Sequence, residues 1–182
     1  QLKGFDYWEK AAARNTFFVE DKKVASISRI LGHVFDGEED FLKAWRERVG
    51  EEEARRISEA STRRGTALHT KLEDYLINNS TDLVFTEEMT TDQKQFEVFI
   101  QRLFNQLRPL LSKKVSKIHG MEIPLVSPTL MAGGRLDLLC EYAGKLTLAD
   151  FKSSDKKISI SSDKAKKYFA QMIFYALILF DL

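Results

Sequence analysis

The chain has 182 residues, of which 43% are hydrophobic and 30% are charged, and its net charge is +1. This length and composition indicate one globular domain with a sizeable core. The balanced charge excludes a polycation, so any contact with nucleic acid must come from a local basic patch. Cys140 is the single cysteine, which excludes a disulfide framework and a cysteine metal site and indicates a reducing compartment.

Hydropathy predicts no association with a membrane. We expect no signal peptide, and the apolar run at residues 172–180 is too short to span a bilayer, so it is predicted to be a buried helix. The chain begins at Gln1 without Met and stops at Leu182 inside the apolar stretch. We therefore expect one domain that is truncated at its C-terminus.

The first fifty residues are expected to be largely helical. Residues 4–14 favour a short helix, and residues 22–31 favour an extended piece followed by a turn at Gly32. A second turn at residues 36–37 precedes residues 38–49, where apolar side chains recur at helical spacing. The glycine after this segment is expected to end the helix.

The middle of the sequence predicts two long helices. The first covers residues 51–77, either continuously or with a break near Gly65. The second is capped by Thr90 or Thr91 and either ends near Pro109 or continues past it.

Three strands and a last helix are expected to follow. Residues 115–126 are predicted to be extended, and residues 133–152 to form a hairpin with its turn at residues 143–144. One of the serines at residues 161–162 would cap a helix over residues 163–182. This order of elements predicts an α/β or α+β domain in which helices pack on a small mixed sheet.

The predicted hairpin brings two acids together. With a tight turn at residues 143–144, its register places Asp137 opposite Asp150. Like charges opposed across two strands are destabilising, so a cation between the carboxylates is the best explanation. Oxygen ligands with room for water favour Mg²⁺, and Lys152 adds a positive charge on the same face as Asp150. The alternative is a solvated hairpin face.

Two helices carry polar pairs at a spacing of one turn. His69 and Glu73 share a face of the long helix, and Gln171 and Tyr175 share a face of the last helix. A buried Gln must be hydrogen-bonded, so it needs a reason to be there. Taken singly, each pair is better explained as solvated or as lying on the rim of the core.

These pieces together, in chain order, resemble the RecB-like branch of the PD-(D/E)XK nuclease superfamily. RGTALH, GGRLD, DFK and QMIFY carry the resemblance, which spans roughly residues 60–182. The stretch from Trp45 through GEEEA is similar to phage-encoded exonucleases and to the mitochondrial single-strand exonuclease group. Asp150 stands where Glu is usual, and the iron–sulfur cysteines of some relatives are absent.

The resemblance implies a restriction-endonuclease-like α/β core in a single nuclease domain. A small mixed central sheet would be flanked by helices within a catalytic core at residues 61–182. Residues 1–60 would form a helical N-terminal part.

The resemblance also implies hydrolysis of phosphodiester bonds with one or two Mg²⁺ or Mn²⁺ ions. Asp137 and Asp150 would hold the metal, and Lys152 would orient the attacking water. His69 would complete the metal shell and favour Mn²⁺, since imidazole is softer than carboxylate. Further candidates for the metal shell are the carbonyl of Phe151 and the side chains of Glu122 and Glu73.

DNA would be held by basic and polar side chains near these residues. The resemblance assigns Gln171 and Tyr175 to holding the nucleic-acid backbone or to bracing the site. Tyr168 and Phe169 could stack on bases. The predicted basic contacts are Arg64, Lys156, Lys157 and Lys167, and the alternative for these lysines is a solvated lysine-rich loop.

The function implied is that of an exonuclease in phage or cellular DNA replication, recombination or repair. Its substrate would be DNA with free ends or in single-stranded form. Its compartment would be the cytoplasm of a bacterium or of a phage-infected host, with mitochondria as an alternative. Two other hypotheses stay open: a structure-specific endonuclease, and a non-catalytic module that binds DNA or protein on the same fold.

Overall fold

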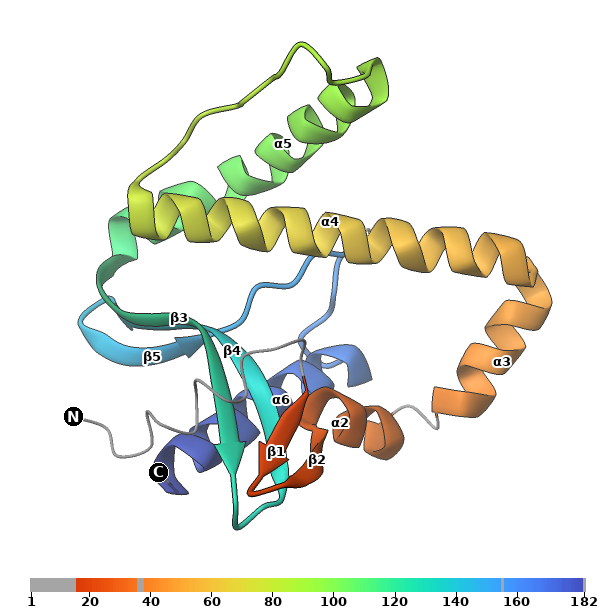
Figure 1. Cartoon of the computed structure of the whole chain (residues 1–182), viewed down its shortest axis with the longest axis vertical. Helices are drawn as coiled ribbons and strands as arrows, with labels where there is room; N and C mark the ends of the chain where they lie inside the picture. The colour runs from red at the N-terminus through yellow and green to blue at the C-terminus, as the bar shows by residue number, and fades with distance from the viewer. Residues whose placement is uncertain (1–15, 36–37, 155, 182) are drawn as a thin grey trace.

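The computed structural model describes residues 16–35, 38–154 and 156–181, and Figure 1 shows their arrangement. Within these residues, the protein is an α/β domain with one mixed sheet of five strands and five helices. The strands are β1 (Phe17–Val19), β2 (Lys22–Ser26), β3 (Val115–Ser127), β4 (Ala132–Tyr142) and β5 (Lys145–Ala149). The helices are α2 (Ile27–Phe35), α3 (Glu38–Val49), α4 (Glu51–Asn78), α5 (Thr91–Lys114) and α6 (Asp163–Asp181).

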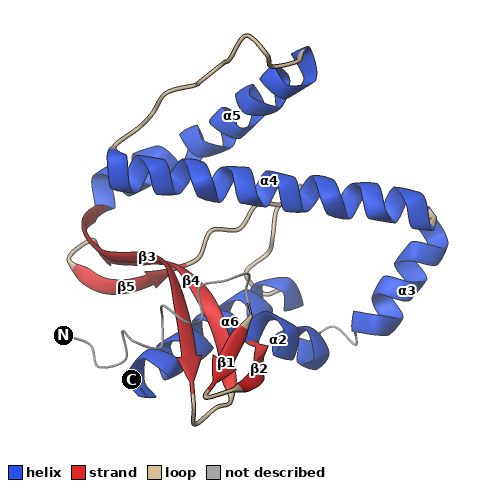
Figure 2. Cartoon of the chain, viewed as in Figure 1, coloured by secondary structure: helices blue, strands red, loops and turns tan. Residues whose placement is uncertain are grey.

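The sheet is organised around β4. Its order is β1-β2-β4-β3, and β5 also pairs with β4. β4 runs parallel to β2 near Ala132 and antiparallel to both β3 and β5. Figure 2 shows β1, β2 and the ends of β3 and β4 at one end of the sheet and β5 at its other end, below α4. β4 therefore links the two ends of the sheet.

The N-terminal part differs from the sequence prediction because residues 17–26 form the hairpin of β1 and β2. Phe17 and Val24 are buried with Val126 of β3. A Cβ at Gly133 would lie 2.5 Å from the ring of Phe17, so this glycine lets the hairpin approach β4 closely. The count of three strands is therefore wrong, and the piece expected to be extended at residues 22–31 is a strand only as far as Ser26, after which α2, α3 and the start of α4 form the helical part. A short strand pair held by such distant contacts leaves little local signal.

The transition from β2 to α2 also differs from the prediction. α2 begins directly after Ser26, whose Oγ accepts a hydrogen bond from the Arg29 backbone nitrogen at 3.3 Å. Gly32 is buried within α2 rather than in a turn. The predicted helix at residues 4–14 and turn at residues 36–37 lie outside the described residues.

The long helices follow the prediction more closely. The bounds expected for α3 are confirmed. α4 continues through Gly65, so the alternative of a break there is wrong. Burial of Leu68 and Leu72 against Phe104 of α5 outweighs the modest cost of a glycine inside a helix. Asn79 ends α4 in the left-handed conformation, with φ 55°.

The predicted caps are found on α5 and α6. The Thr90 side chain accepts from the Gln93 backbone nitrogen, and the Gln93 side chain accepts from the Thr90 nitrogen. α5 continues past Pro109 to Lys114. The Ser162 hydroxyl accepts from the Ala165 nitrogen at the start of α6. No helix in the described part of the chain combines the length and apolarity needed to cross a membrane.

The predicted register of the β4–β5 hairpin is confirmed. The ladder runs from Tyr142 opposite Lys145 to Leu138 opposite Ala149. Ala143 and Gly144 have φ 50° and 77°, as a tight hairpin turn requires. Pairing stops one step before Asp137 and Asp150, so these residues lie at the open end of the hairpin.

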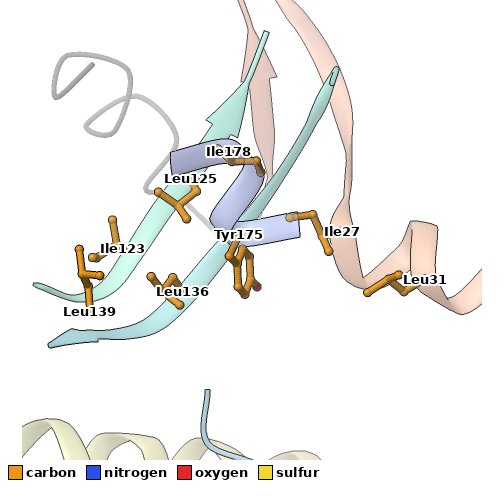
Figure 3. Packing of buried hydrophobic residues seen from close by; sticks show 8 residues of the cluster. All are labelled: Ile27, Leu31, Ile123, Leu125, Leu136, Leu139, Tyr175 and Ile178. Carbon is orange, nitrogen blue, oxygen red and sulfur yellow. The ribbon is translucent and has the colours of Figure 1, made fainter. Parts of the chain in front are cut away.

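The main core lies between the sheet and the pair α2 and α6. Figure 3 shows Leu125 and Leu136 of the sheet beside Tyr175 and Ile178 of α6, with Ile27 of α2 close by. This cluster fixes β3 and β4, the two strands that carry the acids described below. Cys140 is buried in β4, as expected, and burial raises the pKa of its thiol.

Candidate metal centre

Polar side chains from three elements converge near the open end of the β4–β5 hairpin. His69 comes from α4, Glu122 from β3 and Asp137 from β4. One ligand atom of each lies within 4.8 Å of the others. This is the one such group of three or more among the described His, Cys, Asp and Glu residues.

His69 is the hub of this group. Its Nδ1 lies 3.4 Å from Glu122 Oε1, and its Nε2 lies 3.7 Å from Asp137 Oδ2. The same Nε2 lies 2.9 Å from the carbonyl oxygen of Phe151, which can only accept a hydrogen bond. The imidazole therefore donates to the segment that follows β5. Its ring also meets the Phe151 ring edge-on, at 6.1 Å between centroids.

The Asp137 carboxylate is buried and held in place. The backbone nitrogen of Phe151 donates to its Oδ2 at 2.6 Å. Burial, followed by the negative charge of Asp150, raises the pKa of Asp137 to about 6. A buried carboxylate whose ionisation is disfavoured in this way is stabilised by a positive charge.

Glu122 reaches the group from a strained backbone. Its φ is 48°, although it lies inside β3 and is not a glycine. Such a conformation costs on the order of 1 kcal/mol and persists only where the surroundings fix it. Arg135 supplies part of this support: its Nη1 donates to the Glu122 carbonyl at 2.8 Å, and its Nε lies 3.9 Å from Glu122 Oε2. Arg135 thus holds both the backbone and the carboxylate of Glu122.

Asp150 and Lys152 form a separate pair beside the group. The Lys152 ammonium contacts Asp150 Oδ2, and the Asp150 side chain is only 7% exposed. Asp150 is not among the three residues that meet within 4.8 Å. The structure therefore brings His69, Glu122 and Asp137 together, whereas the sequence prediction had placed Asp150 with His69 and Asp137.

The charges around His69 favour its protonated form. Three acids (Glu122, Asp137 and Asp150) face two permanent cations, Arg135 and Lys152. The hydrogen bond to Glu122 raises the pKa of His69 to about 9 against the opposing effect of burial, and the charge of Asp137 also raises it. A protonated His69 supplies the third positive charge and donates from both nitrogens.

Gln171 and Tyr175 brace β4 from within the core. The Gln171 Nε2 donates to the Tyr175 hydroxyl at 2.9 Å, which donates to the Arg135 carbonyl at 2.7 Å. A Cβ at Gly134 would lie 2.5 Å from the Tyr175 ring, so this glycine lets the ring approach. Tyr175 is 1% exposed, which favours the predicted bracing role over contact with nucleic acid.

The predicted basic contacts lie in different places. Arg64 is half-buried on α4, and its Nε donates to Ser153 Oγ at 3.2 Å. Lys156 and Lys157 are exposed after β5, and Lys167 is half-buried on α6.

We call His69, Glu122 and Asp137 the metal-ligand group, after the ion that they could hold. A hollow of about 560 Å³ adjoins this group and is lined by His69, Glu122, Arg135, Glu73, Thr66, Thr70 and Gly65.

Arg135 is the residue that sequence reasoning missed. It lies two residues before Asp137 in GGRLD, so strand alternation places both on one face of β4. Strand alternation could therefore have predicted that Arg135 lies at this site. The left-handed conformation of Glu122 could not have been predicted, because it depends on the neighbouring strand.

The donor set fits a divalent cation. Two carboxylates and an imidazole are ligands that Mn²⁺, Mg²⁺ and Zn²⁺ accept. Atoms bound to one such ion lie about 3 to 4.5 Å apart, close to the spacing of this group. No model of a known protein family matches the chain, and no curated protein matches it.

Proposed function

We propose that this chain is a metal-dependent deoxyribonuclease with a restriction-endonuclease-like core, and that it degrades DNA from an end. The observation that carries the proposal is the meeting of His69, Glu122 and Asp137 beside the Asp150–Lys152 pair. An ion pair that only stabilises the fold would not require a half-buried histidine, two convergent acids and an adjacent hollow in one place. The choice of exonuclease follows from the resemblance of the sequence to phage-encoded exonucleases.

The chain's own groups suit a metal site. Glu122 and Asp137 are held by Arg135 and by the Phe151 nitrogen, so their carboxylates need little reorganisation. His69 would give up a proton if an ion were bound there and compensated the charges of the two acids. A divalent cation bound there would lower the pKa of a bound water and neutralise charge on the scissile phosphate.

Lys152 suits the phosphate side of the reaction. Its ammonium is held by the buried Asp150 carboxylate at the edge of the group. From there it can orient a water molecule or contact the phosphate oxygens on which charge builds up. Asp150 acts in this proposal by positioning Lys152.

The test is digestion of end-labelled linear and closed circular single-stranded DNA with Mn²⁺ or Mg²⁺. The parent protein is compared with Lys152→Ala and with Lys145→Ala, an exposed lysine at the turn end of the same hairpin. We expect the linear strand alone to be degraded, by the parent and by Lys145→Ala but not by Lys152→Ala. Circular dichroism checks that both variants fold.

The same assay separates the alternatives. Cutting of circles identifies an endonuclease. Binding of DNA without any product identifies a non-catalytic module. Equal products from Lys152→Ala and the parent protein would contradict the assignment of Lys152 to catalysis.

A further inference from the structure

A second hollow, of about 510 Å³, lies between α4, α5 and residues 152–154, 156 and 158. We call it the basic hollow, after the three cations in its lining: Arg64, Lys152 and Lys156. It shares no lining residue with the hollow over the metal-ligand group. It adjoins that group nevertheless, since Lys152 contacts Asp150 and Arg64 precedes His69 on α4.

One wall of the basic hollow is positively charged. Arg64 comes from α4, and Lys152 and Lys156 come from the segment after β5. The hydroxyl of Ser153 accepts from Arg64, which joins the two sides of this wall. None of the described lining residues is acidic, although Asp150 contacts Lys152 from outside the hollow. Three cations in one lining suit an anionic ligand.

The part of the lining that α5 contributes is apolar apart from Gln106. Phe99, Leu103 and Leu107 recur at intervals of four residues along the helix. Phe99 is 41% exposed, so its ring is not used up in packing between α4 and α5. An exposed aromatic ring and three cations in the lining of one hollow suit a ligand that is both planar and anionic.

A nucleotide with an unstacked base has both properties. Sites for single strands combine basic side chains along the backbone with aromatic rings on which bases stack. Paired bases inside a duplex are already stacked on their neighbours and cannot offer a face to Phe99. The size of the basic hollow lies within the usual range of ligand pockets.

We propose that the basic hollow binds one unpaired nucleotide of the substrate strand, next to the scissile phosphate. Its base lies against Phe99, and its phosphate faces Arg64 and Lys156. The word substrate rests on the proposed nuclease function, but the binding itself does not. The preference is for single-stranded DNA or for a frayed end.

The test compares binding of two labelled strands of equal length, oligothymidylate and a fully abasic strand, in EDTA. The ratio of the two affinities measures what the bases contribute. We expect Phe99→Ala to lower this ratio by about five- to a hundredfold, the range for loss of one stacked base. Phe18→Ala is the matched control, because Phe18 is also 41% exposed, lies on β1 and is outside the basic hollow.

A second variant separates the cationic part of the lining from the apolar part. Lys156→Gln should weaken binding of both strands equally and reduce the slope of log affinity against log salt by about one unit. If Phe99→Ala fails to fold by circular dichroism, Phe99→Leu is measured in its place, since it keeps an apolar side chain without a ring face. An unchanged ratio in the Phe99 variant, or an equal loss in Phe18→Ala, would overturn the proposal.

The outcome is independent of nuclease activity. A ratio that depends on Phe99 in a protein without nuclease activity overturns the proposed function alone. Cleavage that depends on Lys152, with a ratio indifferent to Phe99, overturns the basic hollow alone.

Discussion

Asp137 and Asp150 lie at the open end of one hairpin, yet their charges are compensated in different ways. Their side chains are almost equally buried, at 8% and 7% exposed. Asp137 faces His69 and the Phe151 nitrogen, whereas Asp150 contacts the ammonium of Lys152. His69 can release its proton when a metal ion binds beside Asp137. Lys152 would have to move as a whole side chain before an ion could take its place beside Asp150. On this difference we base the proposal that the Asp137 side binds metal and the Asp150 side contacts phosphate.

The largest expected difference is between the two variants in which one acid is exchanged for its amide. Asp137→Asn should weaken Mn²⁺ binding by at least about a hundredfold, because it removes a charged ligand. Asp150→Asn should leave Mn²⁺ binding within about threefold of the parent, because its carboxylate holds Lys152. Calorimetric titration with Mn²⁺ checks both values. Equal losses in the two variants would remove the distinction between the acids.

The pH dependence of Mn²⁺ affinity should show which side binds the metal. The pKa of His69 is raised to about 9 through Glu122 and Asp137, so binding below that pH must displace a proton. Affinity should therefore rise about tenfold per pH unit from about pH 7 to 9 and level off above. Below about pH 6 the slope should steepen as Asp137 also binds a proton. The charges of Asp150 and Lys152, beside this group, also act on the pKa of Asp137.

Two histidine variants make this measurement decisive. His69→Gln should weaken Mn²⁺ binding and remove the slope above pH 7. His119→Gln is the matched control, because His119 pairs with Glu141 away from the metal-ligand group. A flat profile in the parent protein would show that His69 does not exchange a proton for the ion.

In the absence of metal, the free energy of unfolding should fall as the pH rises from about 6.5 through about 9. Because the folded-state pKa of His69 is raised, its contribution is complete below about pH 6.5 and is lost as pH rises through about 9.

A smaller effect is expected at Arg135. Arg135→Met keeps the length of the side chain but removes the donors that hold Glu122. Mn²⁺ affinity should fall by about ten- to a hundredfold, the usual range for loss of a group that orients a metal ligand. Calorimetry with Arg55→Met, an exposed arginine of α4, is the control. Unchanged affinity would mean that the strained Glu122 keeps its place without Arg135.

The smallest effect is expected at Gly65. A Cβ there meets no atom within 4 Å, and the residue is helical. Gly65→Ala should therefore raise the free energy of unfolding by up to about 1 kcal/mol and leave Mn²⁺ affinity unchanged. Urea denaturation measures the gain. A loss of stability would show that the hollow on the Asp137 side is packed rather than open.

Local patterns predicted the elements that local interactions determine. The Thr90 cap, the bounds of α3 and the turn at Ala143 and Gly144 follow from side-chain chemistry within a few residues. The register then follows from the turn, which is why Asp137 could be placed near Asp150. These parts of the fold need no knowledge of distant contacts.

The parts that sequence could not predict depend on contacts between distant segments. β1 is short and is stabilised by Phe17 packing over Gly133. Glu122 takes a left-handed conformation because of its neighbours on β4. The pairing of Asp150 with Lys152 depends on how the chain leaves β5. Such features appear only when the sheet is assembled.

The most direct test of the central claim is a crystal structure with Mn²⁺, located by its anomalous scattering. We expect one ion within about 2.0–2.3 Å of a His69 nitrogen and of carboxylate oxygens of Glu122 and Asp137. Lys152 should remain on Asp150. An ion held between Asp137 and Asp150 without His69 or Glu122, or no ion at saturating Mn²⁺, would contradict this assignment.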